Sequence, residues 1–103
     1  MIAKLVSFQL PKDMGRDEVI SLAREAAEEW LKHSTLIRKD FLLDENNITY
    51  GYYLFPDREN AEKAHDSDFL DNLKQRLGVV PEMKYFDYLM TADVVKGAIT
   101  GLD

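Results

Sequence analysis

The chain has 103 residues and a mass of 11.9 kDa, the size of one small domain. Thirteen Lys and Arg against nineteen Asp and Glu give a net charge of −6, so the clustered cations that bind nucleic acid or anionic membranes are missing. The lack of cysteine excludes disulfides and thiolate chemistry, and no apolar run approaches the ~18 residues of a membrane span. We expect a cytoplasmic protein, a single domain over residues 1–103, with no nucleic-acid or membrane partner.

The first third of the chain predicts a strand followed by a helix. In residues 2–10 apolar side chains alternate along the chain, and Pro11 ends the strand. From residue 16 to 33 apolar residues recur at three- and four-residue spacing, which is typical of a helix that buries one face. Trp30 lies on that face and is expected in the core.

A two-stranded hairpin is predicted next. Residues 36–44 and 48–55 are rich in β-branched and aromatic residues, and Asn46 and Asn47 lie between them. Asn tolerates left-handed backbone angles, so these residues fit a tight turn between antiparallel strands.

The second half predicts two short helices, a fourth strand and a tail. Asp57 is suited to cap a helix that reaches Ala64, and Asp66 or Ser67 a second helix that ends at Gly78. Residues 82–91 predict the fourth strand, and residues 92–103 a C-terminal tail with weak helical character. The order is that of an α+β, ferredoxin-like βαββαβ fold, a four-stranded antiparallel sheet with its helices on one face.

Both faces of the predicted sheet carry large apolar side chains. Tyr50 and Tyr52 alternate with Tyr53 and Phe55 in the third strand, although helices cover only one face. Burying one large side chain is worth about 1.5–3 kcal/mol, so an uncovered aromatic face is costly. We expect a homodimer, packed sheet to sheet around an enclosed cavity. The alternative is that the tail from Ala92 folds over the open face.

An aromatic third strand is also typical of RNA recognition motifs. Tyr50-Gly51-Tyr52 and Phe55 match the aromatic–Gly–aromatic core of that motif. Ile48 and Thr49 stand where a basic residue and a glycine belong, and the chain is acidic, so the composition opposes RNA binding.

Four segments resemble a family of monooxygenases. Gly51-Tyr52-Tyr53-Leu54-Phe55-Pro56-Asp57, followed by Ala61 and Ala64, is similar to the strand-to-helix signature of the YdhR-type family in the dimeric α+β barrel superfamily, beside the antibiotic-biosynthesis-monooxygenase group. Lys39-Asp40-Phe41 before Asp44-Glu45, and Phe86-Asp87 before a short tail, extend the likeness to about 90 residues. Ser7 departs from the pattern, because a histidine is expected there. The resemblance implies a homodimeric barrel that oxygenates a small aromatic or polyketide-like substrate without metal, flavin or other cofactor.

Such an oxygenase needs an aromatic pocket and a group that stabilises a phenolate. Lys39 is the candidate catalytic residue, because its ammonium would stabilise the developing anion. The alternative is an exposed lysine that protects a sheet edge. The candidate substrate-binding residues are the aromatic side chains of the strands, which would wall the pocket and orient the substrate through hydroxyls: Phe41, Tyr50, Tyr52, Tyr53, Tyr85 and Tyr88.

No metal site is expected. His33 and His65 are each predicted at the end of a helix, where a cation interacts favourably with the helix dipole. They have no partner at ligand spacing, and Ile48 occupies a ligand position in the calcium-loop-like run that begins at Asp44. The rival to an oxygenase is a non-catalytic dimer of the same fold that binds a small molecule or regulates, because a fold does not define an activity.

Overall fold

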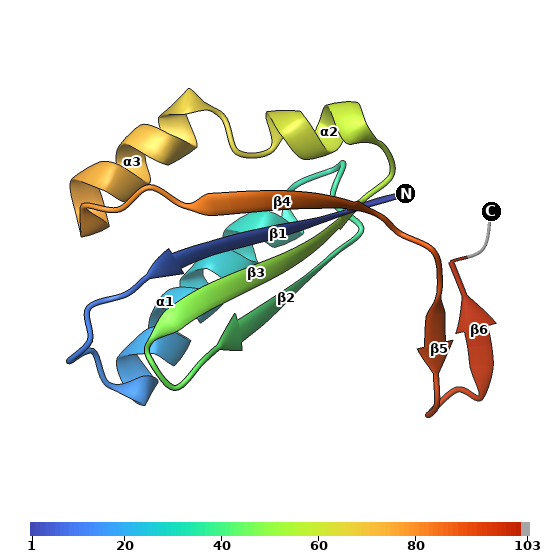
Figure 1. Cartoon of the computed structure of the whole chain (residues 1–103), viewed down its shortest axis with the longest axis horizontal. Helices are drawn as coiled ribbons and strands as arrows, with labels where there is room; N and C mark the ends of the chain where they lie inside the picture. Colours follow the sequence, from blue (N-terminus) through green and yellow to red (C-terminus); the bar gives the residue numbers. More distant parts are fainter. Residues whose placement is uncertain (102–103) are drawn as a thin grey trace.

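A computed structural model describes residues 1–101. Four antiparallel strands form one sheet in the order β2-β3-β1-β4, and three helices lie on one side of it (Figure 1). The elements are β1 (Ile2–Gln9), α1 (Arg16–Leu31), β2 (Arg38–Leu43), β3 (Ile48–Phe55), α2 (Arg58–Lys63), α3 (Ser67–Leu77) and β4 (Glu82–Asp87). This is the predicted ferredoxin-like arrangement, with α2 and α3 sharing the second crossover.

The register of the strands decides which side chains face the helices. Lys4 pairs with Tyr53 on one side and with Tyr85 on the other, and Tyr53 also pairs with Lys39 of β2. Paired residues project to the same face of a sheet. These four side chains therefore define the inner face, towards the helices, and the residues next to them in sequence define the open face.

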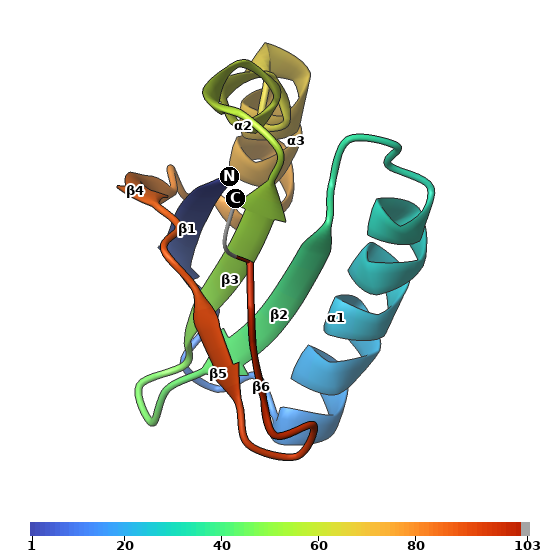
Figure 2. The same cartoon turned by 90° about the vertical axis from the view of Figure 1, so that its right-hand side faces the viewer.

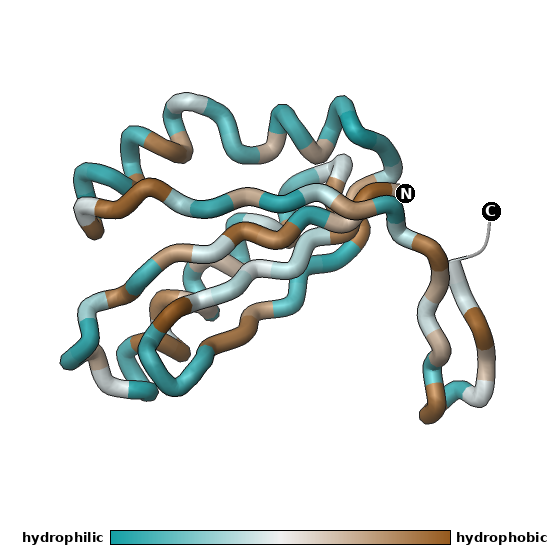
Figure 3. The backbone as a smooth tube through the Cα atoms, viewed as in Figure 1, coloured by the Kyte–Doolittle hydropathy of each residue, from teal (hydrophilic) through white to brown (hydrophobic). Residues whose placement is uncertain are grey.

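The core lies on the inner face. Val6, Phe55 and Ala61 are at most 2% exposed, and Tyr53 packs with them. Trp30 of α1 packs against this cluster, as its place in the helical pattern predicted. Apolar residues along the strands appear as brown segments of the backbone tube in Figure 3.

Local sequence signals set the ends of the elements as expected. Asp57 accepts a hydrogen bond from the Asn60 N–H at the start of α2, and Asp66 accepts one from the Phe69 N–H at the start of α3. Gly78 ends α3 with a φ of 69°, and Asn47 has a φ of 59° in the turn between β2 and β3. These confirm the predicted caps and turn.

The C-terminal part differs from the prediction. The fourth strand ends at Asp87, which pairs with Ile2 at the start of β1. Tyr88 still donates its N–H to the Met1 carbonyl, and the chain then leaves the sheet. Beyond it, β5 (Thr91–Asp93) and β6 (Ala98–Thr100) form a hairpin turned at Gly97, so the weak helix predicted from residue 92 is wrong through residue 101. The last two residues of that predicted tail lie outside the described residues.

The hairpin stands apart from the domain (Figure 1). Neither of its strands packs against an element of the main sheet or a helix within residues 1–101. The alternative in which this segment covers the open face is therefore wrong for the single chain. None of the helices in the same part of the chain is long and apolar enough to cross a lipid bilayer.

Candidate functional site

A cavity of about 760 Å³ lies between the inner face of the sheet and the helices α1 and α3. It exists because these two helices do not pack against each other, and Figure 2 shows them set apart. Its apolar wall combines residues of both helices and three strands: Val6, Phe8, Trp30, Phe41, Tyr53 and Phe69. This cavity lies within the single chain, and the cavity expected between the sheets of two subunits stays a prediction.

The Lys39 amine lies among aromatic rings in this wall. Its Nζ is 3.9 Å from the ring centre of Phe41, 4.6 Å from that of Tyr53 and 5.3 Å from that of Trp30. Within the described part of the chain, it forms no hydrogen bond or ion pair. Burial lowers the pKa of Lys39 from 10.5 to about 7, because no carboxylate compensates the lost hydration of the ammonium.

Tyr53 supplies a neutral hydroxyl beside this amine. Its ring lies opposite Lys39 in the strand pairing and is 2% exposed. Burial raises the pKa of Tyr53, so the hydroxyl stays protonated at physiological pH. It has no hydrogen-bonding partner among residues 1–101, which leaves two unpaired polar groups in the aromatic part of the wall, although charged residues of α1 and α3 also line the pocket.

Gly51 makes room for both groups. A Cβ at this position would lie 2.7 Å from Cε1 of Tyr53 and 3.1 Å from Cε of Lys39. Both side chains therefore lie over the bare backbone of β3, and Phe41 is directly across from Gly51 in the neighbouring strand. Glycine is needed here for close approach of side chains and not for its backbone angles.

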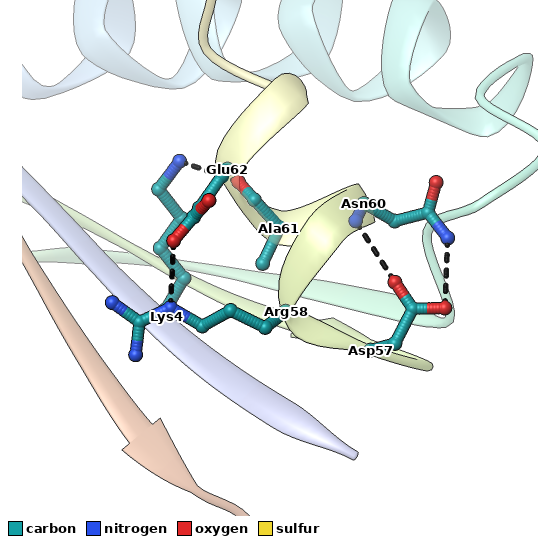
Figure 4. Close-up of polar contacts among 6 residues, drawn as sticks. All are labelled: Lys4, Asp57, Arg58, Asn60, Ala61 and Glu62. Carbon is teal, nitrogen blue, oxygen red and sulfur yellow. Dashed lines mark hydrogen bonds and ion pairs between the residues drawn. The ribbon is translucent and has the colours of Figure 1, made fainter.

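A second polar cluster lies deeper, beneath α2. Lys4 is fully buried, and its Nζ donates to the Ala61 carbonyl at 2.7 Å and to Nδ1 of His65 at 2.8 Å. Figure 4 shows Lys4 reaching the Ala61 carbonyl of α2, away from the Asp57 cap at the start of that helix. Burial lowers the pKa of Lys4 to about 8, and Glu62 opposes this shift.

His65 is held neutral in this cluster. Its Nδ1 accepts from Lys4, which leaves the proton on Nε2, and Nε2 is buried without a hydrogen-bonding partner. Burial, reinforced by Lys4, Lys39 and His33, lowers the pKa of His65 to about 3. The rings of Trp30, Tyr53 and Phe69 surround it, with centroids 4.7–5.3 Å away.

Three of the seven predicted site residues meet in the cavity. Lys39, Phe41 and Tyr53 share its wall. Tyr50 and Tyr52 project from the open face, where the Tyr50 hydroxyl donates to Asp44. The structure therefore separates the tyrosines of β3 into two groups with different surroundings.

The other two predicted residues lie elsewhere. Tyr85 is on the inner face but borders Lys4 and Arg58, and β4 contributes no residue to the cavity. Tyr88 follows β4, and its hydroxyl shares a hydrogen bond with Thr91 next to the hairpin.

For His65 the predicted role as a helix-end cation is wrong. His65 lies between α2 and α3, neutral and buried against Lys4. His33 follows the end of α1, where its ring contacts Trp30 and its Nδ1 shares a hydrogen bond with Thr35. Among residues 1–101, no three His, Asp or Glu side chains gather as a metal site would require.

Sequence reasoning missed Lys4, Gly51 and His65 as parts of the site. Lys4 is two residues before the buried Val6 in the same strand, so its side chain projects to the same buried face. Gly51 lies between aromatic residues in a strand interior, a pattern that indicates close approach by another group. His65 carries no comparable signal, because its partner is 61 residues away in the sequence.

Comparison with known proteins defines the class of fold. No family model matches the sequence, and no curated protein is detectably similar to it. Solved structures do resemble it at 12–15% identity, and all three described below share its α+β ferredoxin-like fold. At this level of identity the likeness shows the fold alone.

The first of these structures is an antibiotic biosynthesis monooxygenase, with 15% identity and a TM-score of 0.63 over 86% of this chain and 99% of the other. The protein YJCS has 14% identity and a TM-score of 0.62 over 86% of this chain and 100% of its own. Rv0793 from Mycobacterium tuberculosis has 12% identity and a TM-score of 0.64 over 89% of this chain and 98% of its own. The neighbours bear out the predicted fold, whereas the superfamily and the YdhR-type family stay predictions.

Replacing Gly51 with Ala should disrupt the cavity wall. The new methyl group would overlap Tyr53 and press on Lys39, and overpacking of this kind costs about 1–3 kcal/mol. We expect a loss of that size in the free energy of unfolding, measured by urea titration, together with shifted NMR signals from the Tyr53 ring. Gly15→Ala is the matched control, because a Cβ there meets open space; as an N-cap it should lose only about 0.5 kcal/mol. Equal losses in the two variants would contradict the close approach at Gly51.

Proposed function

We propose that this chain is a cofactor-independent monooxygenase that acts on a small, electron-rich phenol or hydroquinone in the cavity between the sheet and its helices. The observation that carries the proposal is the Lys39 amine, unpaired in an aromatic wall of a pocket large enough for such a ring. The fold shared with an antibiotic biosynthesis monooxygenase supports the same class of reaction.

Lys39 would start the reaction as a base. With a pKa of about 7, a large fraction of the amine is unprotonated at neutral pH and can accept the phenol proton. The resulting ammonium then lies beside the phenolate in a water-poor site, where the attraction is strong. The aromatic rings within 5.3 Å of Nζ stabilise this ammonium further.

The substrate itself would supply the electrons. A hydroquinone that reacts with one O₂ becomes a hydroxyquinone, and the second oxygen atom leaves as water, so no external reductant is needed. Tyr53, neutral and beside Lys39, would donate a hydrogen bond that orients a substrate oxygen.

Oxygen uptake tests the proposal. Wild-type protein with a panel of phenols and hydroquinones should consume one O₂ and release one water for each quinone formed from a phenol or each hydroxyquinone formed from a hydroquinone. Lys39→Met should abolish this turnover. Lys12→Met, at an exposed loop position, is the matched control and should keep full activity. Full activity in Lys39→Met would remove Lys39 from the mechanism.

The rival function is ligand binding without chemistry. It is favoured by the aromatic surroundings of Lys39, where Tyr53 adds a neutral hydroxyl and, among residues 1–101, no carboxylate pairs with the amine. Ligand-dependent thermal stabilisation without oxygen uptake would establish this alternative.

We also propose that a second copy of the chain covers the open face. Tyr50, Tyr52 and Phe86 project from it, with Leu42 54% exposed at the β2 edge. The hairpin adds large exposed side chains at Val94, 89%, and Val95, 99%. A sheet-to-sheet homodimer would bury this surface.

Tyr52→Asp should weaken this dimer at least tenfold. A central aromatic side chain commonly contributes about 2 kcal/mol to an interface, and the substitution would place a carboxylate there. Sedimentation equilibrium measures the change. Gln75→Asp on the exposed side of α3 adds the same charge on the helix side and should leave the dissociation constant unchanged. An unaltered sedimentation profile in Tyr52→Asp would exclude this face of β3 from the interface.

A further inference from the structure

Lys39 differs from an ordinary strand lysine in having no counterion. Its Nζ borders the cavity, three aromatic rings lie within 5.3 Å, and among residues 1–101 it has no hydrogen-bonding partner. A buried amine is normally paired or hydrogen-bonded, as Lys4 is in the neighbouring cluster. The lone pair of Lys39 is therefore available to a molecule that enters the cavity.

Burial, with no compensating ion pair, leaves a substantial fraction of the amine as the free base near neutral pH. Glu18, Glu25, Glu28 and Glu29 of α1 and Arg76 of α3 line the cavity. None of them forms an ion pair with Lys39. On the sheet side Lys4 and the neutral His65 offer no anion, and His33 follows α1. Burial therefore dominates and lowers the pKa of Lys39 to about 7.

We infer that Lys39 captures neutral aromatic aldehydes and ketones in this cavity as an imine at Nζ. The nitrogen lone pair attacks the carbonyl carbon and forms a carbinolamine. Loss of one water molecule, made of the former carbonyl oxygen and two protons, then gives the C=N bond, with no oxidant or reductant. Desolvated lysines in apolar pockets are suited to this chemistry.

The surroundings also indicate which carbonyl compounds fit. The aromatic rings around Nζ stabilise a positively charged iminium ion, as they would an ammonium. Four glutamates against one arginine along the cavity disfavour anionic ligands. Neutral aldehydes attached to an aromatic ring are therefore the favoured class. The inference shares its cavity with the proposed function but requires no oxygen chemistry.

Reductive trapping tests the inference directly. The wild-type protein is incubated at pH 7 with 4-hydroxybenzaldehyde and cyanoborohydride, which converts the imine to a stable secondary amine. Peptide mass spectrometry then measures the labelling rate at every lysine and, separately, at the amino terminus. We expect Lys39 to be labelled at least tenfold faster than any other lysine, with a rate that falls as the pH drops below about 7.

Two controls separate cavity chemistry from surface labelling. Lys39→Met should lose the fast label and keep the slow ones, whereas Lys12→Met should keep the fast label. In wild-type protein an excess of 4-methylphenol, which cannot form an imine, should protect Lys39 by occupying the cavity. This second control holds even if the Lys39 variant folds poorly.

Even labelling of all lysines, or no protection by 4-methylphenol, would overturn the inference. Labelling at Lys39 without oxygen uptake would support the imine and remove the monooxygenase. Oxygen uptake without preferential labelling of Lys39 would support the monooxygenase and overturn the imine.

Discussion

Lys39→Met should raise the free energy of unfolding at pH 7 by roughly 2–4 kcal/mol, although it removes the candidate catalytic group. The folded chain holds the pKa of this amine at about 7, against 10.5 when it is solvated. One pH unit of difference corresponds to about 1.4 kcal/mol, so the full difference would give roughly 5 kcal/mol. Lys39 keeps some exposed surface, and methionine loses the attraction of an ammonium to the rings, which reduces the expected gain.

The pH dependence identifies the cause of this gain. Between about pH 7 and 10.5 the unfolded chain binds a proton at Lys39 that the folded chain does not. Wild-type stability therefore rises with pH in this window, and the difference from Lys39→Met disappears near pH 10.5. Urea titrations at pH 7, 8, 9 and 10 measure how the free energy of unfolding changes with pH in wild type and in Lys39→Met. Lys4, whose pKa is also lowered, contributes equally to both proteins and cancels in the comparison.

Lys12→Met serves as the control for these titrations, because Lys12 is exposed in the loop before α1. Parallel curves for wild type and Lys39→Met would show that the amine is well solvated in the folded state. They would also remove the basis for its action as a base or nucleophile. The same desolvation that lowers the stability of the fold also lowers the pKa of Lys39 and so makes the amine reactive. Such a trade-off between stability and activity is expected at a functional site.

Signals that act within a few residues made much of the fold predictable. Asp57 and Asp66 cap helices through N–H groups three positions ahead, and Asn47 and Gly78 adopt the backbone angles that their residue types favour. Such interactions are set by local chemistry, so they can be identified in the sequence without knowing the tertiary structure. Together with strand periodicity they were sufficient for the ferredoxin-like arrangement.

The site depended on information of a different kind. The pairing of β3 with β1 and β2 decides whether Tyr52 or Tyr53 faces the helices. The sequence of β3 does not decide it, because the odd-numbered and the even-numbered residues both include large apolar side chains. The cavity arises from the separation of α1 and α3, which no single element specifies. The Lys4–His65 contact joins residues 61 positions apart. The aromatic character of the site was therefore predictable, but its location on the inner face was not.

The C-terminal hairpin is set by a local turn signal. Gly97 has a φ of 64°, and Asp93 accepts a hydrogen bond from the Lys96 N–H, so residues 93–97 have ordinary turn chemistry. The strands on either side have three residues each, which is too short for alternation to be detected. The turn signals at Asp93 and Gly97 outweigh the weak helical character of the sequence from residue 92.

His65→Gln should make the protein markedly more resistant to acid. The buried ring has a pKa of about 3 in the folded chain, against 6.5 when solvated. Below about pH 6.5 the unfolded chain takes up a proton that the folded chain refuses, so stability falls as the pH falls towards 3. The loss is about 1.4 kcal/mol per pH unit, or roughly 3 kcal/mol by pH 4.

Glutamine keeps the hydrogen bond while removing the titration. Its side-chain oxygen can accept from Lys4 Nζ in place of Nδ1, so the buried ammonium retains an acceptor besides the Ala61 carbonyl. Urea titrations between pH 7 and 4 should therefore give a shallower slope for His65→Gln than for wild type. His33→Gln, at the half-buried histidine beside Trp30, is the matched control.

The change in the free energy of unfolding with pH, and not its value at pH 7, tests the titration of His65, because the substitution also changes packing against Tyr53 and Phe69. Acidic groups such as Asp44, whose pKa is lowered by the Ile48 and Asn46 N–H groups, contribute equally to both proteins and cancel in the comparison. If wild type and His65→Gln lose stability at the same rate, the ring is protonated in the folded state. The Lys4 contact would then bring two cations together, and Glu62, whose charge already opposes the lowering of the Lys4 pKa, would have to compensate both.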